Sequence, residues 1–536
     1  MFSPAQHYTI ILIYEGPRCW MFPPPKRRPN TCDTHVSKWA EATYKFTNKF
    51  STVKELYFTG SRLPLPPGPY GIPILGYLPF VGHDFHLRLT ELGKKYGSIY
   101  QIHLGTKRVV VINDARLIKE AFRQQVFSGR PDTELTRILQ GYGIVNTDGA
   151  LWKEQRAFLH SVLRKLGAKS MILGRDCLEL KIRSQVQIFL NDLKSTIRNK
   201  QSSINIRPYL ACAASNVIGS LLMSMTFKSS DRKFRRIIEL MEEGFRLFAI
   251  AMPVNFFPLF RFVPLVNYAY RKMQTNRDET SGYFHEIVEE HRQTLDPEHI
   301  RDFVDAYLVQ HDRIKESGQD SFFSEKQLIQ VMNDIFSAGL ENVTSTIEWA
   351  VLFLMLNPKI QQQIQTEIDQ VIGQGKEAKL ADLEQMPYME ATFWEILRRS
   401  NIVALGNTHS TLEDSSLAGY SIPATTNILP NLYAINMDPE LWENPEEFNP
   451  DRFLRNGRVH RPEYFIPFSV GRRMCLGDIL TKMEVFLFLT SLLQQFDLKV
   501  PDGERPPEVA SIVSASMAPR PFKVSLVERS NGSMFK

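Results

Sequence analysis

Residues 468–477 are the segment best suited to chemistry, because they place a cysteine in a glycine-flanked loop before an apolar helix pattern. The dipole and free amides of a helix N-terminus favour the thiolate of Cys475, the form that binds iron. Gly471 and Gly477 permit a tight turn and close approach of the backbone to a large planar ligand, and Arg473 can pair with a carboxylate. A lone cysteine is more often a buried structural residue. The surrounding pattern instead favours Cys475 as a metal ligand.

Two further groups of residues have a spacing that suits cofactor binding or ion pairing. Trp152 and Arg156 lie four apart, so on a helix the indole N–H and the guanidinium share a face and can both bond one carboxylate. Glu395 and Arg398 lie three apart, where a helix can hold an ion pair that Arg452 closes from a loop. Taken alone, such a pair would be interpreted as a solvated surface pair.

The elements that must position these residues are mostly helical. Short strands are expected at residues 98–104 and 108–113, and helical periodicity then prevails to about Leu397. The longest expected helix has Ser324 as N-cap, with Gln327 in the capping-box position, and ends at residue 357. At about 1.5 Å per residue it would span roughly 50 Å and cross the whole molecule.

The middle of this long helix is narrow. Ala338 and Gly339 are small where their neighbours are bulky. A flat cofactor could lie against the backbone there, and close packing of two helices explains the pattern equally well.

These segments, in this order, resemble the cytochrome P-450 superfamily from about Pro66 to Val527. Residues 468–477 match every fixed position of its haem-binding signature, Phe-x-x-Gly-x-Arg-x-Cys-x-Gly. Residues 395–398 resemble its Glu-x-x-Arg pair, with Arg452 as the third member of that ion network. The resemblance implies a mainly α fold with small β-sheets, in which haem b lies between the long helix and the loop of Cys475. It also implies a monooxygenase that uses O₂ and electrons from NADPH through an acidic flavoprotein reductase.

The resemblance further assigns residues to the cofactor and to oxygen. The implied cofactor-binding set is Arg130, Trp152, Arg156, Ala338, Gly339, His409, Phe468, Arg473 and Cys475. Within this set the propionates would be held by Arg130, Trp152, Arg156, His409 and Arg473. The implied catalytic set is Glu341, Asn342 and Thr344, in a run similar to the family's oxygen-binding groove. Asn342 stands where the family usually has threonine, and an amide has fixed donor and acceptor ends, so a weaker proton relay is expected.

Two other functions stay open at this point. A haem-thiolate isomerase or dehydratase would rearrange a peroxide without reductase or O₂, which Asn342 allows, and a non-catalytic haem protein would only bind a lipophile. Four segments are similar to arthropod microsomal enzymes, especially ecdysteroid side-chain hydroxylases: residues 141–144, 152–156, 408–410 and 462–468. Because substrate pockets diverge faster than the haem frame, this similarity gives a lipophilic substrate, with an ecdysteroid as a hypothesis.

The composition is that of a globular protein, with 43% hydrophobic and 23% charged residues among 536. Disordered and polytopic membrane classes are thereby disfavoured. The net charge of +6 is too small and too dispersed to indicate nucleic-acid binding. The five cysteines show no CxxC spacing, so neither a disulfide framework nor a zinc site is expected, as suits a reducing compartment: Cys19, Cys32, Cys177, Cys212 and Cys475.

Three parts are expected along the chain: an atypical leader over residues 1–60, a proline-rich hinge over 61–79 and a haem-thiolate catalytic domain over 80–536. The leader lacks the roughly 20 apolar residues of a membrane-spanning helix. Residues 252–260 form a proline-broken aromatic loop that we expect to contact a membrane surface. The resemblance implies the endoplasmic reticulum membrane, on its cytoplasmic face, with the mitochondrion as the alternative.

Overall fold

The structure is a computed structural model that describes residues 63–82, 84–168, 175–198, 203–228, 230–512 and 514–529. The expected leader over residues 1–60 lies outside these described residues. Across the described ranges, no helix has both the length and the apolar character that crossing a membrane would require.

Most of the described chain is helical, as the sequence predicted. The α-helices are α2 (Phe85–Tyr96), α3 (Ala115–Arg123), α4 (Glu134–Arg137), α5 (Gly149–Lys165), α6 (Arg175–Arg198), α7 (Arg207–Leu222), α8 (Arg232–Ala251), α9 (Pro264–Gln293), α10 (Phe303–Ser317), α11 (Glu325–Leu356), α12 (Pro358–Val371), α13 (Pro387–Ser400), α14 (Leu432–Asn436) and α15 (Asp478–Gln495). Short 3-10 helices are η1 (Leu78–Phe80), η2 (Gln125–Ser128), η3 (Met252–Asn255), η4 (Pro258–Phe262), η5 (Leu380–Gln385), η6 (Pro450–Phe453) and η7 (Gly471–Arg473).

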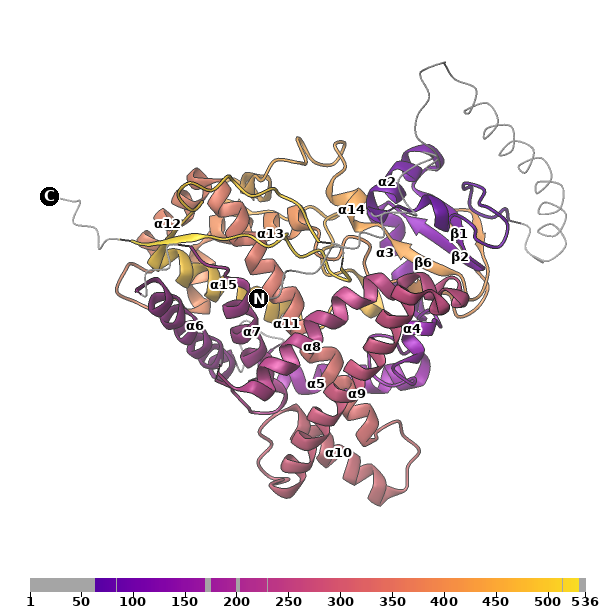
Figure 1. Ribbon diagram of the computed structural model, residues 1–536, viewed down its shortest axis with the longest axis horizontal. Helices are drawn as coiled ribbons and strands as arrows, with labels where there is room; N and C mark the ends of the chain where they lie inside the picture. The colour runs from indigo at the N-terminus through magenta and orange to yellow at the C-terminus, as the bar shows by residue number, and fades with distance from the viewer. Residues whose placement is uncertain are drawn as a thin grey trace, which may run out of the picture.

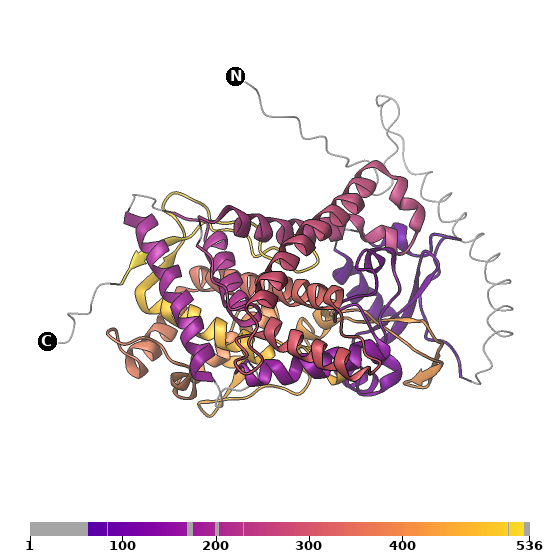
Figure 2. The same cartoon turned by 90° about the horizontal axis from the view of Figure 1, so that it is seen from below.

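The strands form small sheets at the margins of the helical body. The largest has the order β1-β2-β6-β3, with β1 (Ile99–Leu104), β2 (Lys107–Ile112), β3 (His409–Ser410) and β6 (Asn427–Pro430). Three hairpins pair β4 (Ser415–Leu417) with β5 (Tyr420–Ile422), β7 (Leu454–Arg455) with β8 (Arg458–Val459), and β9 (Phe496–Lys499) with β10 (Ser525–Glu528). In both Figure 1 and Figure 2 the region of β1, β2 and β6 lies at one side of the helices and the β9–β10 hairpin at the opposite side. The mainly α fold with small sheets is thus confirmed.

Helix α11 runs through the middle of the helical body (Figure 1) and packs against α7, α9, α13 and α15. Its N-cap is Ser324, as predicted, whose side chain accepts from the Gln327 amide at 3.3 Å. The prediction that Gln327 completes a capping box is wrong, because its side chain does not bind the Ser324 N–H. That N–H donates to the Tyr307 hydroxyl at 3.3 Å. The Gln327 side chain instead bonds both the N–H and the carbonyl of Gly143, at 3.0 and 2.9 Å. A long-range contact with Gly143 therefore uses the Gln327 side chain that local spacing assigned to the cap.

The proline-rich segment before residue 79 lies along β1. The Pro67 carbonyl accepts from the Gln101 amide at 2.8 Å, and the Pro64 carbonyl accepts from the Ser421 amide at 2.8 Å. Any Cβ at Gly68 would lie 1.8 Å from the Gln101 carbonyl oxygen. Glycine is required there because the two backbones touch.

Candidate active site

The loop between η7 and α15 presents Cys475 at the protein surface. The Cys475 N–H donates to the Phe468 carbonyl at 3.0 Å, and the Gly477 N–H donates to the Cys475 sulfur at 3.3 Å. Gly471 has φ +76°, and a Cβ on it would lie 2.1 Å from the Phe122 carbonyl oxygen. The turn is therefore fixed by a close backbone approach, and an amide donor is aimed at the sulfur. An amide donor in this position suits the thiolate form of a cysteine.

Arg473 carries its charge into the interior beside this loop. Its Nε donates to the Ser128 carbonyl at 2.9 Å and its Nη2 to the Thr147 carbonyl at 2.6 Å. Its guanidinium lies 3.9 Å from the centre of the Trp152 ring, while Nη1 is buried with no hydrogen-bond partner among the described residues. Burial, and then Arg130, lower the pKa of Arg473 to about 8. A buried donor without a partner marks a place for an anion.

Arg130 reaches the same place from the loop after η2. Its Nε donates to the Val145 carbonyl and its Nη1 to the Thr408 carbonyl, both at 2.8 Å. Burial, and then Arg156, lower the pKa of Arg130 to about 10. Asp148 raises the pKa values of both Arg130 and Arg473, but only as a smaller effect. Asp148 thus offsets only part of the positive charge of Arg130 and Arg473.

Arg156 completes this cationic cluster, and His409 joins it as a neutral imidazole. The His409 ring stacks on Phe122, with centroids 3.7 Å apart, and its Nδ1 lies 2.8 Å from the Phe127 carbonyl. Burial, followed by Arg130, lowers the pKa of His409 to about 3. Arg156 on α5 donates to the Met474 carbonyl next to the cysteine. The structure therefore brings the five expected propionate residues together beside a thiol, and this donor set fits haem b with its two carboxylates.

The ion network predicted around α13 is also brought together. Arg398 donates through Nε and Nη2 to the two oxygens of Glu395, at 2.7 and 2.8 Å, and neither side chain is exposed. Its Nη1 donates to the carbonyls of Asn436 and Pro445, each at 2.8 Å. Arg452 approaches Glu395 at 3.5 Å. The pair thus ties α13 to the segment that follows α14.

The expected oxygen-binding residues divide between different faces of α11. Ala338 is exposed and Asn342, one turn on, is partly exposed, while Gly339 beside them packs against Ile218. Thr344 is 0% exposed and its hydroxyl has no partner among the described residues. Positions two apart on a helix point about 200° apart, so the structure does not bring Thr344 together with Asn342.

Glu341 turns toward α7, where Arg207 binds its Oε2 at 2.8 Å. Arg207 also binds Glu348 at 2.9 Å. Sequence reasoning missed this arginine. The available signal was that Glu341 and Glu348 lie seven apart, on one face of the helix, and a buried carboxylate requires a cation.

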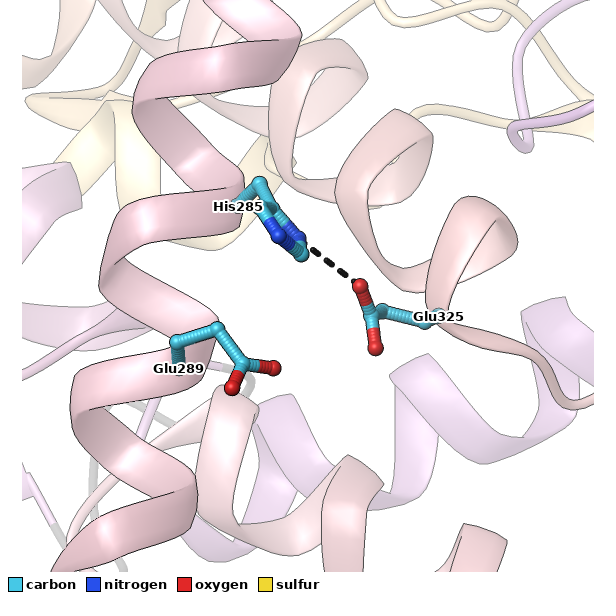
Figure 3. Close-up of side chains that lie close together, drawn as sticks. All are labelled: His285, Glu289 and Glu325. Atoms are coloured by element: carbon cyan, nitrogen blue, oxygen red, sulfur yellow. Dashed lines mark ion pairs between the residues drawn. The ribbon is translucent and has the colours of Figure 1, made fainter.

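A group of further potential metal ligands lies away from the cysteine, where α9 meets the start of α11. Figure 3 shows His285 and Glu289 on one helix facing Glu325 on the other, with the His285 Nδ1 2.8 Å from the Glu325 carboxylate. Arg292 lies 3.6 Å from the carboxylates of both Glu289 and Glu325. Since a protein cation already balances these acids, we assign no metal to them.

A second such group contains His291, Asp302 and Asp305, all buried. The two nitrogens of His291 lie 2.9 Å from the Ile287 carbonyl and 3.0 Å from the Asp302 carboxylate. Arg301 binds both oxygens of Asp305, at 2.6 and 2.7 Å. The group therefore serves to tie α9 to the N-terminus of α10.

Comparison with known proteins agrees with this geometry. The family model described as Cytochrome P450 matches residues 66–526. The chain is 42% identical to cytochrome P450 18a1 of Drosophila melanogaster over 474 residues, which cover 87% of this chain and 88% of that protein. It is 35% identical to cytochrome P450 2U1 of Rattus norvegicus over 491 residues (87% and 91%) and 36% identical to cytochrome P450 2J2 of Homo sapiens over 450 (82% and 87%). The chain belongs to the cytochrome P450 family and is a haem-thiolate monooxygenase that uses O₂ on a lipophilic substrate.

Proposed function

We propose that this enzyme hydroxylates a steroid of the ecdysteroid type, with electrons that reach it from NADPH through a flavoprotein reductase. The observation that carries the reaction class is the exposed thiol of Cys475 next to a cationic cluster, in which Arg473 has a buried donor that no other described residue binds. The substrate class rests on the four segments that resemble arthropod ecdysteroid hydroxylases. The 42% identity to a Drosophila relative supports the likeness to an arthropod enzyme.

Cys475 is proposed to hold the haem iron, with the Gly477 N–H moderating the charge on its sulfur. When bound, the haem supplies oxygen activation, which a thiolate ligand aids by donating electron density. The propionates are assigned to Arg130, Trp152, Arg156, His409 and Arg473. Phe468 is assigned to a further contact with the haem. Glu395, Arg398 and Arg452 hold the surrounding backbone rather than the cofactor.

We assign Ala338 and Gly339 to the contact with the haem on the side where oxygen binds. Asn342 is proposed to order water there through its amide, and Glu341 to supply protons to that water. Thr344 is left out of this set because it lies on another face of α11.

The reductase is proposed to dock where α5 and the cysteine loop share one surface. We call this the thiolate face and define it by the exposed cations Lys153, Arg164, Lys165, Arg455 and Arg472. Arg156 links α5 to the loop through the Met474 carbonyl. A cationic surface suits an acidic partner.

Membrane contact is proposed for the turn between α8 and α9, which consists of η3 and η4. Large apolar side chains are exposed at Leu259 (60%) and Phe262 (66%) in η4, and at Leu265 (49%) and Tyr268 (60%) at the start of α9. Such side chains suit insertion into a lipid surface. We therefore propose the endoplasmic reticulum membrane as the location, with the catalytic body on the cytoplasmic face.

The proposal is tested by incubating the holoenzyme with reductase, NADPH, ¹⁸O₂ and a panel of steroids and other lipids. A monooxygenase gives a product with one ¹⁸O atom and only when both NADPH and reductase are present. An isomerase would form product without either, and a binding protein would form none. Cys475→Ala is expected to abolish the red-shifted carbon monoxide band of the reduced thiolate haem; a retained band refutes the ligand assignment.

A further inference from the structure

Residues 143–147, the turn that precedes α5, connect α11 to the cationic cluster of the active site. We call them the linking turn. From α11, the Oδ2 of Asp334 accepts from the amides of Ile144 and Val145, at 2.7 and 3.0 Å. Its Oδ1 accepts from the Gln330 side chain at 2.9 Å, and Asp334 is only 9% exposed. One buried carboxyl of the central helix therefore fixes the backbone of this turn.

The carbonyls of the same turn hold two arginines of the cationic cluster. Arg130 donates through Nε to the Val145 carbonyl at 2.8 Å. Arg473 donates through Nη2 to the Thr147 carbonyl at 2.6 Å. Both polar groups of the Val145 backbone are thus occupied, the N–H by Asp334 and the carbonyl by Arg130. A displacement of Asp334 would therefore move the acceptor that orients Arg130.

The linking turn has no room to shift against α11. Gly143 has φ +98°, and a Cβ on it would lie 2.5 Å from the Asp334 Oδ2. The Gly143 carbonyl accepts from the Thr147 hydroxyl at 2.8 Å and from the Gln327 side chain at 2.9 Å. Since the turn is closed on itself and packed directly against the helix, it transmits the position of Asp334 to its carbonyls.

The carboxyl of Asp334 is committed to hydrogen bonds rather than to an ion pair. Burial raises the pKa of Asp334, and the N–H bonds from Ile144, Val145 and Gln330 oppose this rise, with no contribution from a charge among the described residues. A buried carboxyl costs free energy unless its hydrogen bonds are satisfied. Because two of its three donors belong to the linking turn, the carboxyl serves to hold that turn.

We propose that Asp334 is a positioning residue for the haem propionates, because it holds the carbonyls of the linking turn that orient Arg130 and Arg473. Ala338, which the proposed function places against the haem, lies four residues beyond Asp334 and therefore on the same side of α11. The helix that meets the face of the haem thus also sets the cations at its edge. The inference rests on the proposed assignment of the propionates.

The test measures how fast the ferric holoenzyme loses haem to an excess of a haem-binding acceptor protein, after each variant is checked for the thiolate carbon monoxide band. Asp334→Ala should lose haem severalfold faster than the wild type, because the arginines are no longer held toward the propionates. Asn333→Ala is the matched control. It removes the neighbouring buried amide, which donates within α11 to the Ile329 carbonyl at 3.0 Å, and it should keep the wild-type rate. A wild-type rate in Asp334→Ala, or the same rise in both variants, would overturn the proposal.

Asp334→Asn tests whether hydrogen bonding is the cause. It keeps an oxygen that can accept from both amides of the turn, while Gln330 can turn its own amide oxygen toward the new NH₂ group. This variant should stay near the wild-type rate, and a rise as large as in Asp334→Ala would contradict positioning by hydrogen bonds. If Asp334→Ala accumulates too little holoenzyme, Gln327→Leu replaces it. Gln327→Leu removes the two bonds to Gly143 and should also speed haem loss, so a wild-type rate there would overturn the proposal.

A double-mutant cycle with Arg130→Met distinguishes positioning from a general loss of stability. If Asp334 acts through Arg130, Asp334→Ala should raise the rate of haem loss much less in the Arg130→Met background than in the wild type. Fully additive effects would show that Asp334 only stabilises the fold.

Haem dimethyl ester, in which both propionates are blocked, separates this inference from the assignment it rests on. The wild type should lose the ester faster than haem b, and Asp334→Ala should reduce the ratio of these two rates. An unchanged ratio in Arg130→Met would overturn the propionate assignment and the inference together. A reduced ratio in Arg130→Met, with a wild-type ratio in Asp334→Ala, would overturn the inference alone.

Discussion

Asn342 is the residue at which the resemblance to the family's oxygen-binding motif is incomplete. It shares one face of α11 with Ala338 and is partly exposed, whereas Glu341 next to it is buried against Arg207. A hydroxyl rotates and both donates and accepts from one atom, while an amide fixes its donor and acceptor at different ends. We therefore expect the substrate to help orient any water that binds beside Asn342.

The first prediction follows for Asn342→Thr. With a substrate that lacks a hydroxyl near the oxygen, the variant should roughly halve the share of NADPH lost as peroxide, because a threonine relays the proton itself. With a hydroxylated substrate, the wild type should already be well coupled and the variant should add little. Peroxide and product are measured for both proteins with hydroxylated and deoxy forms of one steroid. Equal coupling in all four combinations would show that Asn342 has no part in proton delivery.

The second prediction concerns Glu484, which is 2% exposed on α15 and whose Oε2 has no hydrogen-bond partner among the described residues. Burial raises the pKa of Glu484 well above its ordinary value of 4.5. The folded protein thus keeps a proton that the unfolded chain releases, so stability falls as pH rises above about 4.5. Glu484→Gln should lessen this fall and gain about 1–3 kcal/mol at alkaline pH.

Thermal unfolding of the holoenzyme, followed at several pH values, measures this effect. Glu440→Gln, which removes an exposed carboxylate, is the control and should keep the wild-type slope. A Glu484→Gln variant that loses stability as steeply as the wild type with rising pH would show that the carboxyl is not the cause.

At the scale of elements, the sequence predicts what local chemistry determines. The strands β1 and β2, the limits of α11 and the turn before Cys475 follow from alternation, capping and glycine placement, and the structure agrees with each. Gln327 did not follow its local pattern, because Gly143 from a distant loop competes for its side chain. Arg207 was missed for the same reason, since its partners lie more than a hundred residues away on α11.

Thr344 illustrates another limit of sequence reasoning. A family motif gives an order of residues, but the face of a helix that meets a cofactor is set by how that helix packs. Here the side of α11 that carries Glu341 packs against α7, and the side that carries Thr344 is buried in the core. On the side of Ala338 and Asn342, by contrast, the described residues leave the helix accessible.

The third prediction belongs to the tie between α13 and the segment after α14. Arg398→Ala should remove the bidentate partner of the buried Glu395, leaving it, among the described residues, only Arg452 at 3.5 Å as a cation. It should also take the guanidinium donor from the carbonyls of Asn436 and Pro445, at a total cost of about 3–5 kcal/mol. We expect little haem-loaded protein, measured as haem per chain after purification. The neighbouring Arg399→Ala is the matched control, because its guanidinium binds Glu446 near the surface, and it should retain haem. Full haem content in Arg398→Ala would refute the role of the network.

At the scale of the whole molecule, the two proposed contacts use different kinds of surface. The thiolate face consists of cations around the cysteine loop and α5, with Arg156 bound to the Met474 carbonyl. The turn of η3 and η4 exposes large apolar side chains instead. One surface thus suits an acidic protein and the other a lipid layer.

The last prediction tests the thiolate face through its charge. Attraction between opposite charges acts over about 10 Å at 0.1 M salt but only about 3 Å at 1 M. The first electron transfer from the reductase should therefore slow by about tenfold or more over that range. It is measured as the rate at which the carbon monoxide band appears after mixing with reduced reductase. Lys153→Glu and Arg472→Glu should slow this rate at low salt and flatten its salt dependence. Lys233→Glu on α8, which reverses an exposed charge that is paired with Glu286, should do neither. A rate indifferent to ionic strength, or equal effects of all three reversals, would place the reductase elsewhere.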